Sequence, residues 1–344
     1  MSASIFYNTP AALVDMIEKK EREGVIMKKK MVEAQVALGL DKKYIIANIL
    51  MLVTILFWGV SYVSIKITVS EVPPVTTAAI RFVIASLLLW VLLKRVEPGA
   101  KLARADIFPM TLAGCLGITL YFYFENIGVK LTTAANASLI VTIIPILAIG
   151  LDILFFGAKV SALKLVAIVI AIIGTYFSVT ANGQLDMNSA NFVGNLFVVG
   201  AMLSWTFYTL VSKSLQRKYS GMCMTTYQTV IGTLFLLPLA CTEHNEWQAL
   251  SLNAWGHILF LSVCCSVLAY LFYMYVLKQL DVAITTLYLN LVPVVGVISG
   301  YFILGESVLP IQIAGGAITL VAIIIMNLER AKQEKVGENA VEGV

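Results

Sequence analysis

The two halves of this chain carry the same residue pattern at a fixed spacing, and both halves are almost continuously apolar. Trp58 and Lys66 recur 147 positions later as Trp205 and Lys213. One inserted residue then changes the offset to 148, which aligns four further pairs without a gap: Lys130 with Lys278, Ala135 with Ala283, Pro145 with Pro293 and Gly157 with Gly305. These units are much longer than the repeats of about 20–50 residues that build solenoids. Their length and apolar character are typical of a membrane transporter built from two repeats.

Composition indicates that most of the chain lies in lipid. Hydrophobic residues make up 59% of the 344 residues and charged residues 13%, whereas soluble chains hold about 45–50% apolar and about 25% charged residues. The mean hydropathy is +0.89. The five cysteines form no Cys-x-x-Cys pair, so the sequence predicts neither a disulfide framework nor a metal site, and no cofactor is expected.

Ten stretches of the chain reach the length of about 20 mainly apolar residues that a helix needs to cross the hydrocarbon. They are expected at 45–66, 75–93, 107–128, 132–156, 160–179, 192–211, 222–241, 254–277, 282–304 and 311–328. The sequence therefore predicts an all-α integral membrane protein with ten transmembrane helices.

The basic residues predict how these spans are oriented. Ten spans place both termini on one side of the membrane, and all but three of the 24 Lys and Arg residues fall on that side. The exceptions are Lys66, Arg81 and Lys130. Because cytoplasmic loops are enriched in Lys and Arg, both termini are expected in the cytoplasm, with the chain crossing the cytoplasmic membrane many times. This topology already explains the basic clusters, so no nucleic acid is expected as a partner.

Each repeat unit holds five expected helices, an odd number, so the second unit enters the membrane with the opposite orientation. Inverted repeats of this kind enclose a substrate site near the middle of the bilayer in many transporters. We expect the first five-helix repeat at 45–180 and the second, inverted repeat at 190–328. Residues 1–43 are expected to form a cytoplasmic leader, either amphipathic or disordered, and residues 329–344 a cytoplasmic tail.

Several short motifs are similar to those of a known family. They are the run Trp58-Gly59-x-x-Tyr62-x-x-x-Lys66, then Pro74 and Arg81-Phe82, the matched Pro145 and Pro293, and the turn Leu304-Gly305-Glu306. Over about residues 45–328 the chain resembles EamA-type transporters of the drug/metabolite transporter superfamily. The resemblance implies a secondary transporter, frequently an exporter of amino acids or other metabolites, with a cavity lined by helices one to four and six to nine.

The chain departs from the pattern of that family at one place. Ala158 stands where the family usually has a glutamate, while the repeat equivalent Glu306 is kept. Glu306 is therefore expected to cap a turn rather than to carry a coupled proton.

Charged side chains within the apolar spans are candidates for function, because an ion in the bilayer is costly. Arg81 lies inside the second span, where it can face the cavity and attract a carboxylate, reach the outer headgroups or pair with Glu125. Its repeat equivalent is Gln228, so an electrostatically asymmetric cavity is expected. Glu125 and Lys66 are expected near outer helix ends, close to water, where an interfacial anchor is the alternative to a binding role.

Uncharged polar residues beside two matched prolines are candidates for recognition. A proline inside a helix frees a carbonyl about one turn earlier, and in the membrane protein or water must satisfy that carbonyl. Pro145 and Pro293 are expected to kink the fourth and ninth helices in this way, and a plain structural kink is the alternative. The polar candidates on these helices are Asn136, Thr142, Tyr288 and Asn290.

Aromatic residues are expected in the walls of the cavity: Trp58, Tyr62, Tyr121, Trp205, Tyr208 and Tyr270. Trp58 and Trp205 occupy equivalent positions in mid-helix, where the aromatic belt of the membrane interface does not explain them. Tight helix packing and stacking on a flat or apolar substrate are the two interpretations of this pair.

These features predict a secondary transporter that moves a small organic metabolite (an amino acid, a related metabolite or an amphiphilic drug) by alternating access, with export as the direction that the resemblance implies. A passive channel or a lipid-flipping conduit is the alternative. An enzyme is not expected, because the chain has no His-Glu-x-x-His or Gly-x-Ser-x-Gly motif and the expected spans hold no paired carboxylates at helical spacing. Direct use of ATP is not expected either, because the chain has no Walker motif. Proton coupling needs an acidic group near the cavity, for which Glu125, Asp152 and Glu306 are the candidates, and passive exchange needs none. The expected partners are a small-molecule substrate and membrane lipids, and both a monomer and a homodimer fit the sequence.

Overall fold

The computed structural model describes residues 42–144, 146–147, 150–151, 154, 162–179, 190–243, 250–280, 288–289, 291–311, 313–318, 320–322 and 324–325. The chain divides into two compact units, Met1–Ile49 and Leu50–Val344. The described part of the first unit is the start of one helix, and the other described elements belong to the second unit. All regular structure in these residues is helical, which confirms the predicted all-α class for the part of the chain that is described.

The described elements of the first half are α2 (Lys42–Thr68), α3 (Pro74–Val96), the 3-10 helix η1 (Arg104–Asp106), α4 (Ile107–Gly114), the π-helix η2 (Cys115–Leu120), α5 (Tyr121–Leu131), α6 (Ala134–Ile140), the 3-10 helix η3 (Val141–Ile143) and α8 (Ala162–Val179). Those of the second half are α9 (Ala190–Leu215), α10 (Gly221–Cys241), α11 (Leu252–Leu259), the π-helix η5 (Phe260–Leu268), α12 (Ala269–Gln279) and α14 (Val292–Leu304). The segments from η1 to α5 join end to end into one long helix, and those from α11 to α12 join into another.

Six helices are long and apolar enough to cross a membrane: Lys43–Thr68, Pro74–Val96, Arg104–Leu131, Ala190–Ser212, Gly221–Cys241 and Leu252–Val276. They coincide with the first three spans expected in each half. The other four expected spans contain residues outside the described ones, and their described parts include the shorter apolar helices Ala134–Ile143, Val292–Leu304 and Ile313–Ala322.

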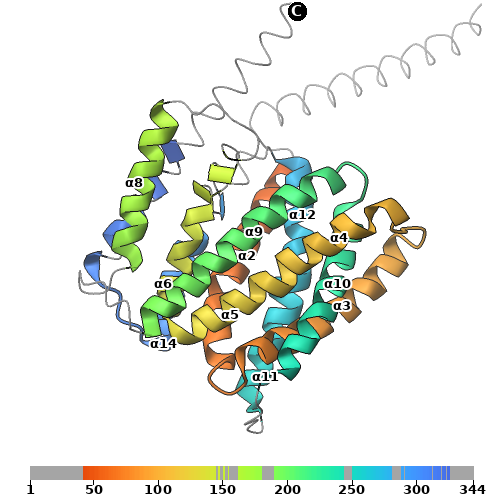
Figure 1. Ribbon diagram of the computed structural model, residues 1–344, viewed down its shortest axis with the longest axis horizontal. Coiled ribbons are helices and arrows are strands. Elements are labelled where there is room, and N and C mark those ends of the chain that lie inside the picture. The colour runs from red at the N-terminus through yellow and green to blue at the C-terminus, as the bar shows by residue number, and fades with distance from the viewer. Residues whose placement is uncertain are drawn as a thin grey trace, which may run out of the picture. The chain divides into compact units, whose positions relative to one another are not determined.

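Helices α3 and α10 lie side by side (Figure 1), and an acidic side chain just after each helix bonds to the start of the other. Glu97, directly after α3, accepts a hydrogen bond of 2.6 Å from Ser220 Oγ at the start of α10. Glu243, just after α10, accepts the backbone N–H groups of Val75 at 3.0 Å and Thr76 at 2.8 Å at the start of α3. The first N–H groups of a helix have no partner within the helix and favour an acidic side chain. The two helices therefore run in opposite directions and are tied together at both ends.

The middle of this helix pair is closed by a polar contact inside an apolar core. The hydroxyl oxygens of Ser86 and Thr233 lie 3.0 Å apart. Around this part of the pair Phe82, Leu89 and Leu236 are at most 1% exposed. Hydroxyl groups that hydrogen-bond across helices are a common means of holding membrane helices together.

Two π-helical segments, η2 and η5, interrupt the third long helix of each half at matching places. A π-turn widens a helix and lets a side chain from a neighbour reach its backbone. The Leu116 carbonyl oxygen accepts a hydrogen bond of 2.8 Å from Ser204 Oγ of α9. The Cys265 carbonyl oxygen accepts one of 3.1 Å from Trp58 Nε1 of α2. These contacts fix how the first turns of α5 and α12, which follow the π-segments, face the interior.

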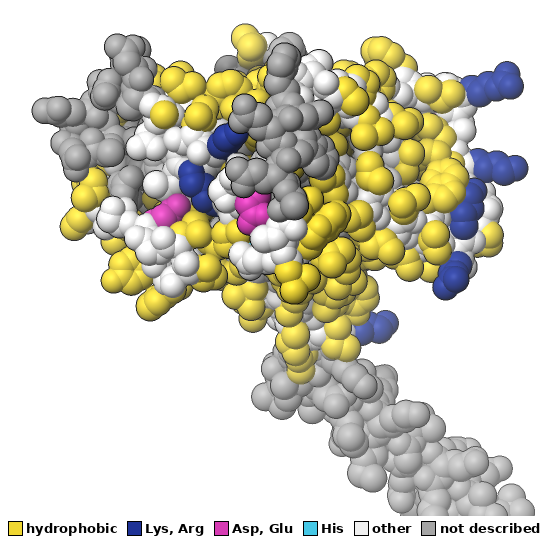
Figure 2. Space-filling model, turned by 90° about the horizontal axis from the view of Figure 1, so that it is seen from below, with side chains coloured by type: hydrophobic (Ala, Val, Ile, Leu, Met, Phe, Trp, Pro, Cys, Tyr) yellow, Lys and Arg dark blue, Asp and Glu magenta, His cyan; other side chains and the backbone are white. Residues whose placement is uncertain are grey.

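The surface of the second unit is rich in apolar side chains. Figure 2 shows hydrophobic side chains over most of the face in view, with several Lys and Arg side chains at its right-hand edge. Phe108 is 76% exposed, Phe302 78% and Leu252 89%. Soluble proteins rarely expose apolar surface of this extent, so this surface is suited to contact with lipid.

Candidate functional site

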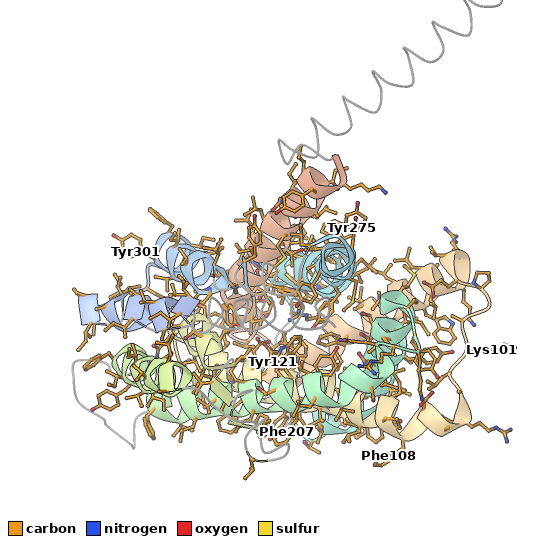
Figure 3. All side chains as sticks on the ribbon, turned by 90° about the horizontal axis from the view of Figure 1, so that it is seen from above. Lys101, Phe108, Tyr121, Phe207, Tyr275 and Tyr301 are labelled. Atoms are coloured by element: carbon orange, nitrogen blue, oxygen red, sulfur yellow. The ribbon has the colours of Figure 1, made fainter. Side chains whose placement is uncertain are left out.

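A cavity of about 160 Å³ lies between helices of the second unit. Its lining consists of Trp58, Ser61, Tyr62, Arg81, Tyr121, Phe122, Glu125, Val141, Thr142, Ile144, Trp205, Tyr270, Leu289, Val292 and Pro293. In Figure 3, Tyr121 lies toward the middle of the helices, whereas Phe108 and Tyr301 lie at the periphery. Apolar walls with a few polar groups are typical of small-molecule sites, and the charged groups here are Arg81 and Glu125.

Arg81 reaches the cavity from α3 with its guanidinium fixed by three neighbours. The residue is 3% exposed, and its Nε donates a hydrogen bond of 2.8 Å to Ser266 Oγ of η5. Its Cζ lies 5.0 Å from the ring centre of Phe82 and 4.6 Å from that of Phe122, and desolvation strengthens such cation–π contacts. Its Nη1 has no hydrogen-bond partner among the described residues. The guanidinium is thus held at the cavity wall with its buried Nη1 available to a ligand.

Glu125 faces the same cavity from α5. Its Oε1 accepts a hydrogen bond of 2.8 Å from the Tyr121 hydroxyl one turn earlier, while its Oε2 has no partner in the described part of the chain. Within the same residues, no ion pair closer than 4.0 Å joins it to Arg81. The sequence places Glu125 near water at a helix end, but it is 3% exposed. The difference arises because the long third helix continues to Leu131 and packs this turn inside the protein.

Aromatic rings form two groups on the cavity walls. Trp58 of α2 packs against Tyr270 and Tyr273 of α12, with ring centres 5.6 Å and 5.5 Å apart. Tyr121 of α5 packs against Trp205 of α9 at 5.3 Å. Since the Trp58 indole also donates to the backbone of η5, its ring is fixed. Paired rings of this kind offer rigid surfaces for a flat or apolar group.

Of the residues predicted from the sequence, the lining includes Trp58, Tyr62, Arg81, Tyr121, Glu125, Thr142, Trp205, Tyr270 and Pro293. Four residues predicted to bind substrate lie outside it: Asn136, Tyr208, Gln228 and Tyr288. Asn136 Nδ2 at the start of α6 donates a hydrogen bond of 2.9 Å to Asn195 Oδ1, and the Tyr208 hydroxyl donates one of 3.1 Å to Gln228 Oε1. Tyr288 is partly buried beyond the lining. Polar groups such as Asn136 and Gln228 therefore join helices to one another.

The model of the EamA-like transporter family matches residues 45–180 and again residues 192–328. This chain belongs to the EamA-like transporter family. An uncharacterized transporter of Archaeoglobus fulgidus is 27% identical over 282 residues, which cover 82% of this chain and 99% of the relative. A probable terminal-alkyne amino-acid exporter of Streptantibioticus cattleyicolor is 25% identical, over 80% of this chain and 92% of the relative. A solved crystal structure shares the fold with a TM-score of 0.62 at 16% identity, over 84% of this chain and 98% of that one. The family and these names indicate a multi-pass membrane transporter rather than an enzyme.

In this EamA-like transporter the proline expected to kink the ninth helix has a different place. Helix α14 begins at Val292, so Pro293 lies in its first turn and not in the interior of a longer helix. Proline is favoured there because the N–H group that it lacks would have no helical partner. Its repeat equivalent Pro145, together with Asn290 and Asp152, lies outside the described residues.

Lys66 and Glu306 bind backbone groups of the α5–α6 turn instead of lining the cavity. Lys66 Nζ donates to the carbonyl oxygens of Val129 and Lys130, both at 2.9 Å, so it is more than an anchor at the membrane interface. Glu306 Oε1 accepts the backbone N–H of Ala134 at 2.8 Å. The Glu306 side chain thus caps the start of α6, a helix of the other half, and not the turn in which Glu306 itself lies.

Several lining residues carry no signal of their own in the sequence: Ser61, Phe122, Val141, Ile144, Leu289 and Val292. Ser266, which holds Arg81, also lies in an apolar stretch without a motif. The spacing of residues along a helix could have identified two of these lining residues, Ser61 and Phe122. Ser61 follows Trp58 by three positions and Phe122 precedes Glu125 by three, so each shares a helix face with a predicted residue.

Proposed function

We propose that this protein is a secondary transporter that carries a small zwitterion, an amino acid with an apolar or single-ring side chain, through the aromatic cavity by alternating access. The observation that carries the proposal is a pair of buried atoms at the cavity wall, Arg81 Nη1 and Glu125 Oε2, neither of which has a hydrogen-bond partner among the described residues. A carboxylate on the ligand satisfies the first atom and an ammonium group satisfies the second.

The cost of unsatisfied groups supports this ligand class. Buried polar groups almost always have a partner, and leaving one unsatisfied costs about 1–3 kcal/mol, more for a charged group. The planar guanidinium of Arg81 suits a carboxylate, and the faces of Trp58 and Trp205 can also attract a cation. The volume of about 160 Å³ is close to the cavity of about 150 Å³ that admits benzene and below the roughly 300–1,000 Å³ of drug-sized pockets. A small metabolite therefore fits better than an amphiphilic drug.

Contacts between repeat-equivalent residues support two inverted five-helix halves, 45–180 and 190–328, with ten spans in total. Ser86 and Thr233, which are 147 positions apart, lie in hydrogen-bonding contact, as equivalent residues do where they meet at a twofold axis. The contacts of Glu97 with the start of α10 and of Glu243 with the start of α3 favour the same symmetry. The equivalent residues Trp58 and Trp205 line one cavity. A site at the junction of two inverted repeats is an arrangement found in many transporters that work by alternating access.

The distribution of Lys and Arg supports both termini in the cytoplasm, with 1–43 as leader and 329–344 as tail, and a location in the cytoplasmic membrane. Export is the proposed direction, because one relative is named a probable amino-acid exporter. Of the acidic candidates for proton coupling, Glu125 lines the cavity, whereas Glu306 is occupied by backbone N–H groups. The third candidate, Asp152, lies outside the described residues. Glu125 is the group that we propose for a proton-coupled cycle, and uptake that does not depend on a pH gradient would exclude obligatory coupling.

The carrier proposal is tested by the accessibility of a cysteine at the cavity wall. Ser61→Cys is introduced into a variant in which serine or alanine replaces the native cysteines Cys115, Cys223, Cys241, Cys264 and Cys265. Right-side-out and inside-out vesicles are treated with a membrane-impermeant maleimide, with and without L-phenylalanine. We expect labelling from both faces and protection by L-phenylalanine. Ser70→Cys, on the exposed turn after α2, is the matched control, labelled from one face and not protected.

Labelling of Ser61→Cys from a single face, or labelling that no zwitterionic amino acid slows, would contradict the carrier proposal. Uptake of labelled L-phenylalanine into proteoliposomes then separates a carrier from a channel. A carrier saturates with substrate concentration and shows counter-exchange, and a passive channel shows neither.

A further inference from the structure

Lys66 holds the C-terminal end of α5 at the turn that leads into α6. Its Nζ donates to the carbonyl oxygens of Val129 and Lys130 at 2.9 Å each, and to that of Thr132. The last carbonyl groups of a helix lack partners within the helix and lie at the negative end of its dipole. A cation is therefore stabilised here, and it draws the end of α5 toward α2 within the first half.

Glu306 holds the other side of the same turn from the second half of the chain. Its Oε1 and Oε2 accept the backbone N–H groups of Ala134 at 2.8 Å and Ala135 at 2.9 Å, the first of α6. Gly305 ends α14 in the left-handed conformation, with φ of 64°, and the Glu306 N–H then bonds to the Gly300 carbonyl oxygen at 3.2 Å. This helix-ending turn, which glycine adopts readily, aims the carboxylate at α6.

Helices α6 and α14 touch closely beside this contact. A Cβ atom added to Gly296 would lie 2.3 Å from the Ser138 Cβ, and one added to Gly300 would lie 3.5 Å from the Ala135 Cβ. Glycine allows membrane helices to approach this closely. The two halves of the chain therefore meet at this end without a gap between α6 and α14, and Glu306 fastens the contact.

We propose that Glu306, with Lys66 holding the turn in place, is the latch that closes the transport pathway at the α5–α6 end. This inference rests on the alternating access proposed above. Opening that end separates α14 from α6, so both backbone bonds to Glu306 break once in each cycle. The bonds from Lys66 stay within the first half and keep the turn intact.

The sequence repeat gives the latch a direction. Lys66 corresponds to Lys213 in the second half, but the position equivalent to Glu306 is Ala158, which lies outside the described residues. The acidic side chain that a matching latch needs is thus missing from the repeat-equivalent position. The resting protein is therefore biased toward the state in which the Glu306 end is closed, the external end in the proposed orientation.

The latch is tested in the Ser61→Cys background with Glu306→Ala. The readout is the maleimide labelling rate from the face at the α5–α6 end divided by the rate from the opposite face. We expect this ratio to rise about tenfold or more, because two hydrogen bonds to a charged group are lost. Glu306→Gln keeps an amide oxygen as hydrogen-bond acceptor, so a smaller rise of the labelling ratio is expected. This variant replaces Glu306→Ala in the test if the alanine variant does not fold.

Glu243→Ala is the matched control. It removes a carboxylate that accepts the backbone N–H groups of Val75 and Thr76, the same kind of cap, from the α3–α10 pair, which is expected to move as one body. This variant is expected to lower the thermal unfolding temperature and to leave the labelling ratio unchanged.

An unchanged ratio in Glu306→Ala, or an equal rise in Glu243→Ala, overturns the latch. If L-phenylalanine still protects Ser61→Cys in that case, the latch is wrong and the carrier proposal stands. Absence of two-sided labelling and protection in the parent Ser61→Cys protein rejects the carrier proposal itself.

Discussion

Replacing Arg81 with methionine removes the cationic side of the proposed site and keeps a long, unbranched side chain. In the structure the guanidinium is held by Ser266 Oγ at 2.8 Å, and its Nη1 at the cavity wall has no partner in the part of the chain that the structure describes. A hydrogen bond to a charged group contributes about 1.5–3 kcal/mol, and about 1.4 kcal/mol is a tenfold change in Kd. L-phenylalanine is therefore expected to bind Arg81→Met about 10- to 100-fold more weakly than it binds the wild type.

The assay is competition binding to purified protein with three compounds that differ by one charge. L-phenylalanine carries both charges, 3-phenylpropionate lacks the ammonium group and 2-phenylethylamine lacks the carboxylate. Arg81→Met is expected to lower the affinity for L-phenylalanine and 3-phenylpropionate and to change the affinity for 2-phenylethylamine by less than about twofold. Glu125→Gln is expected to lower the affinity for L-phenylalanine and 2-phenylethylamine. Arg81→Lys keeps the charge without the planar fork, so its loss is intermediate.

The thermal unfolding temperature of each variant checks that it is folded. A folded Arg81→Met protein that binds L-phenylalanine like the wild type would refute the reasoning. A folded Arg81→Met protein whose affinity for all three compounds falls by the same factor would also refute it.

Three further changes test the surroundings of the site and the fold. Ser266→Ala is expected to weaken binding of L-phenylalanine by about twofold to tenfold, because the guanidinium of Arg81 loses the hydrogen bond that positions it, and Ser266→Thr, which keeps the hydroxyl, should restore binding in the same competition assay. The pKa of Glu71 is lowered from its ordinary value of 4.5 by hydrogen bonds from the backbone N–H and hydroxyl of Ser251. Its contribution to stability is thus present above 4.5 and lost as the pH falls through the lowered pKa; the difference in thermal unfolding temperature between wild type and Glu71→Gln should shrink as the solution is acidified below that range, and a constant difference would argue against it. A Cβ atom on Gly232 would meet a backbone oxygen at 2.5 Å, whereas one on Gly256 meets nothing within 4 Å; Gly232→Ala is expected to destabilise the protein by about 1–3 kcal/mol in denaturant unfolding, and an equal loss in Gly256→Ala would contradict this packing.

The long helices could be predicted from sequence because a chain in lipid must satisfy its backbone internally. The runs that became α2, α3, α9 and α10 are apolar for most of a membrane thickness, so length and hydropathy suffice to find them. The π-segments could not be predicted in this way. They depend on side chains from other helices, such as Ser204 at the Leu116 carbonyl and Trp58 at the Cys265 carbonyl, and nothing within η2 or η5 itself signals these contacts.

The residues of the candidate site also fall into two groups, those that could be predicted from the sequence and those that could not. Arg81 and Trp58 stand out because a charge or an indole within an apolar span needs an explanation, and both line the cavity. Ser61 gives no such signal, because serine is common in membrane helices, where its hydroxyl can bond to a carbonyl of its own helix. In the structure the Ser61 hydroxyl donates to the Trp58 carbonyl oxygen at 2.7 Å. Asn136 gives the same signal as a binding residue but is satisfied by Asn195 of another helix. Sequence alone cannot tell a polar group that awaits a ligand from one that already has a protein partner.

The central claim is that one zwitterion bridges Arg81 and Glu125 inside the aromatic cavity. An experimental structure of the protein with L-phenylalanine bound tests it most directly. The account predicts the ligand carboxylate within hydrogen-bonding distance of Arg81 Nη1, its ammonium group at Glu125 Oε2 and its ring between Trp58 and Trp205. Ligand density outside this cavity, or an amino acid in the cavity whose carboxylate does not contact Arg81, would contradict it.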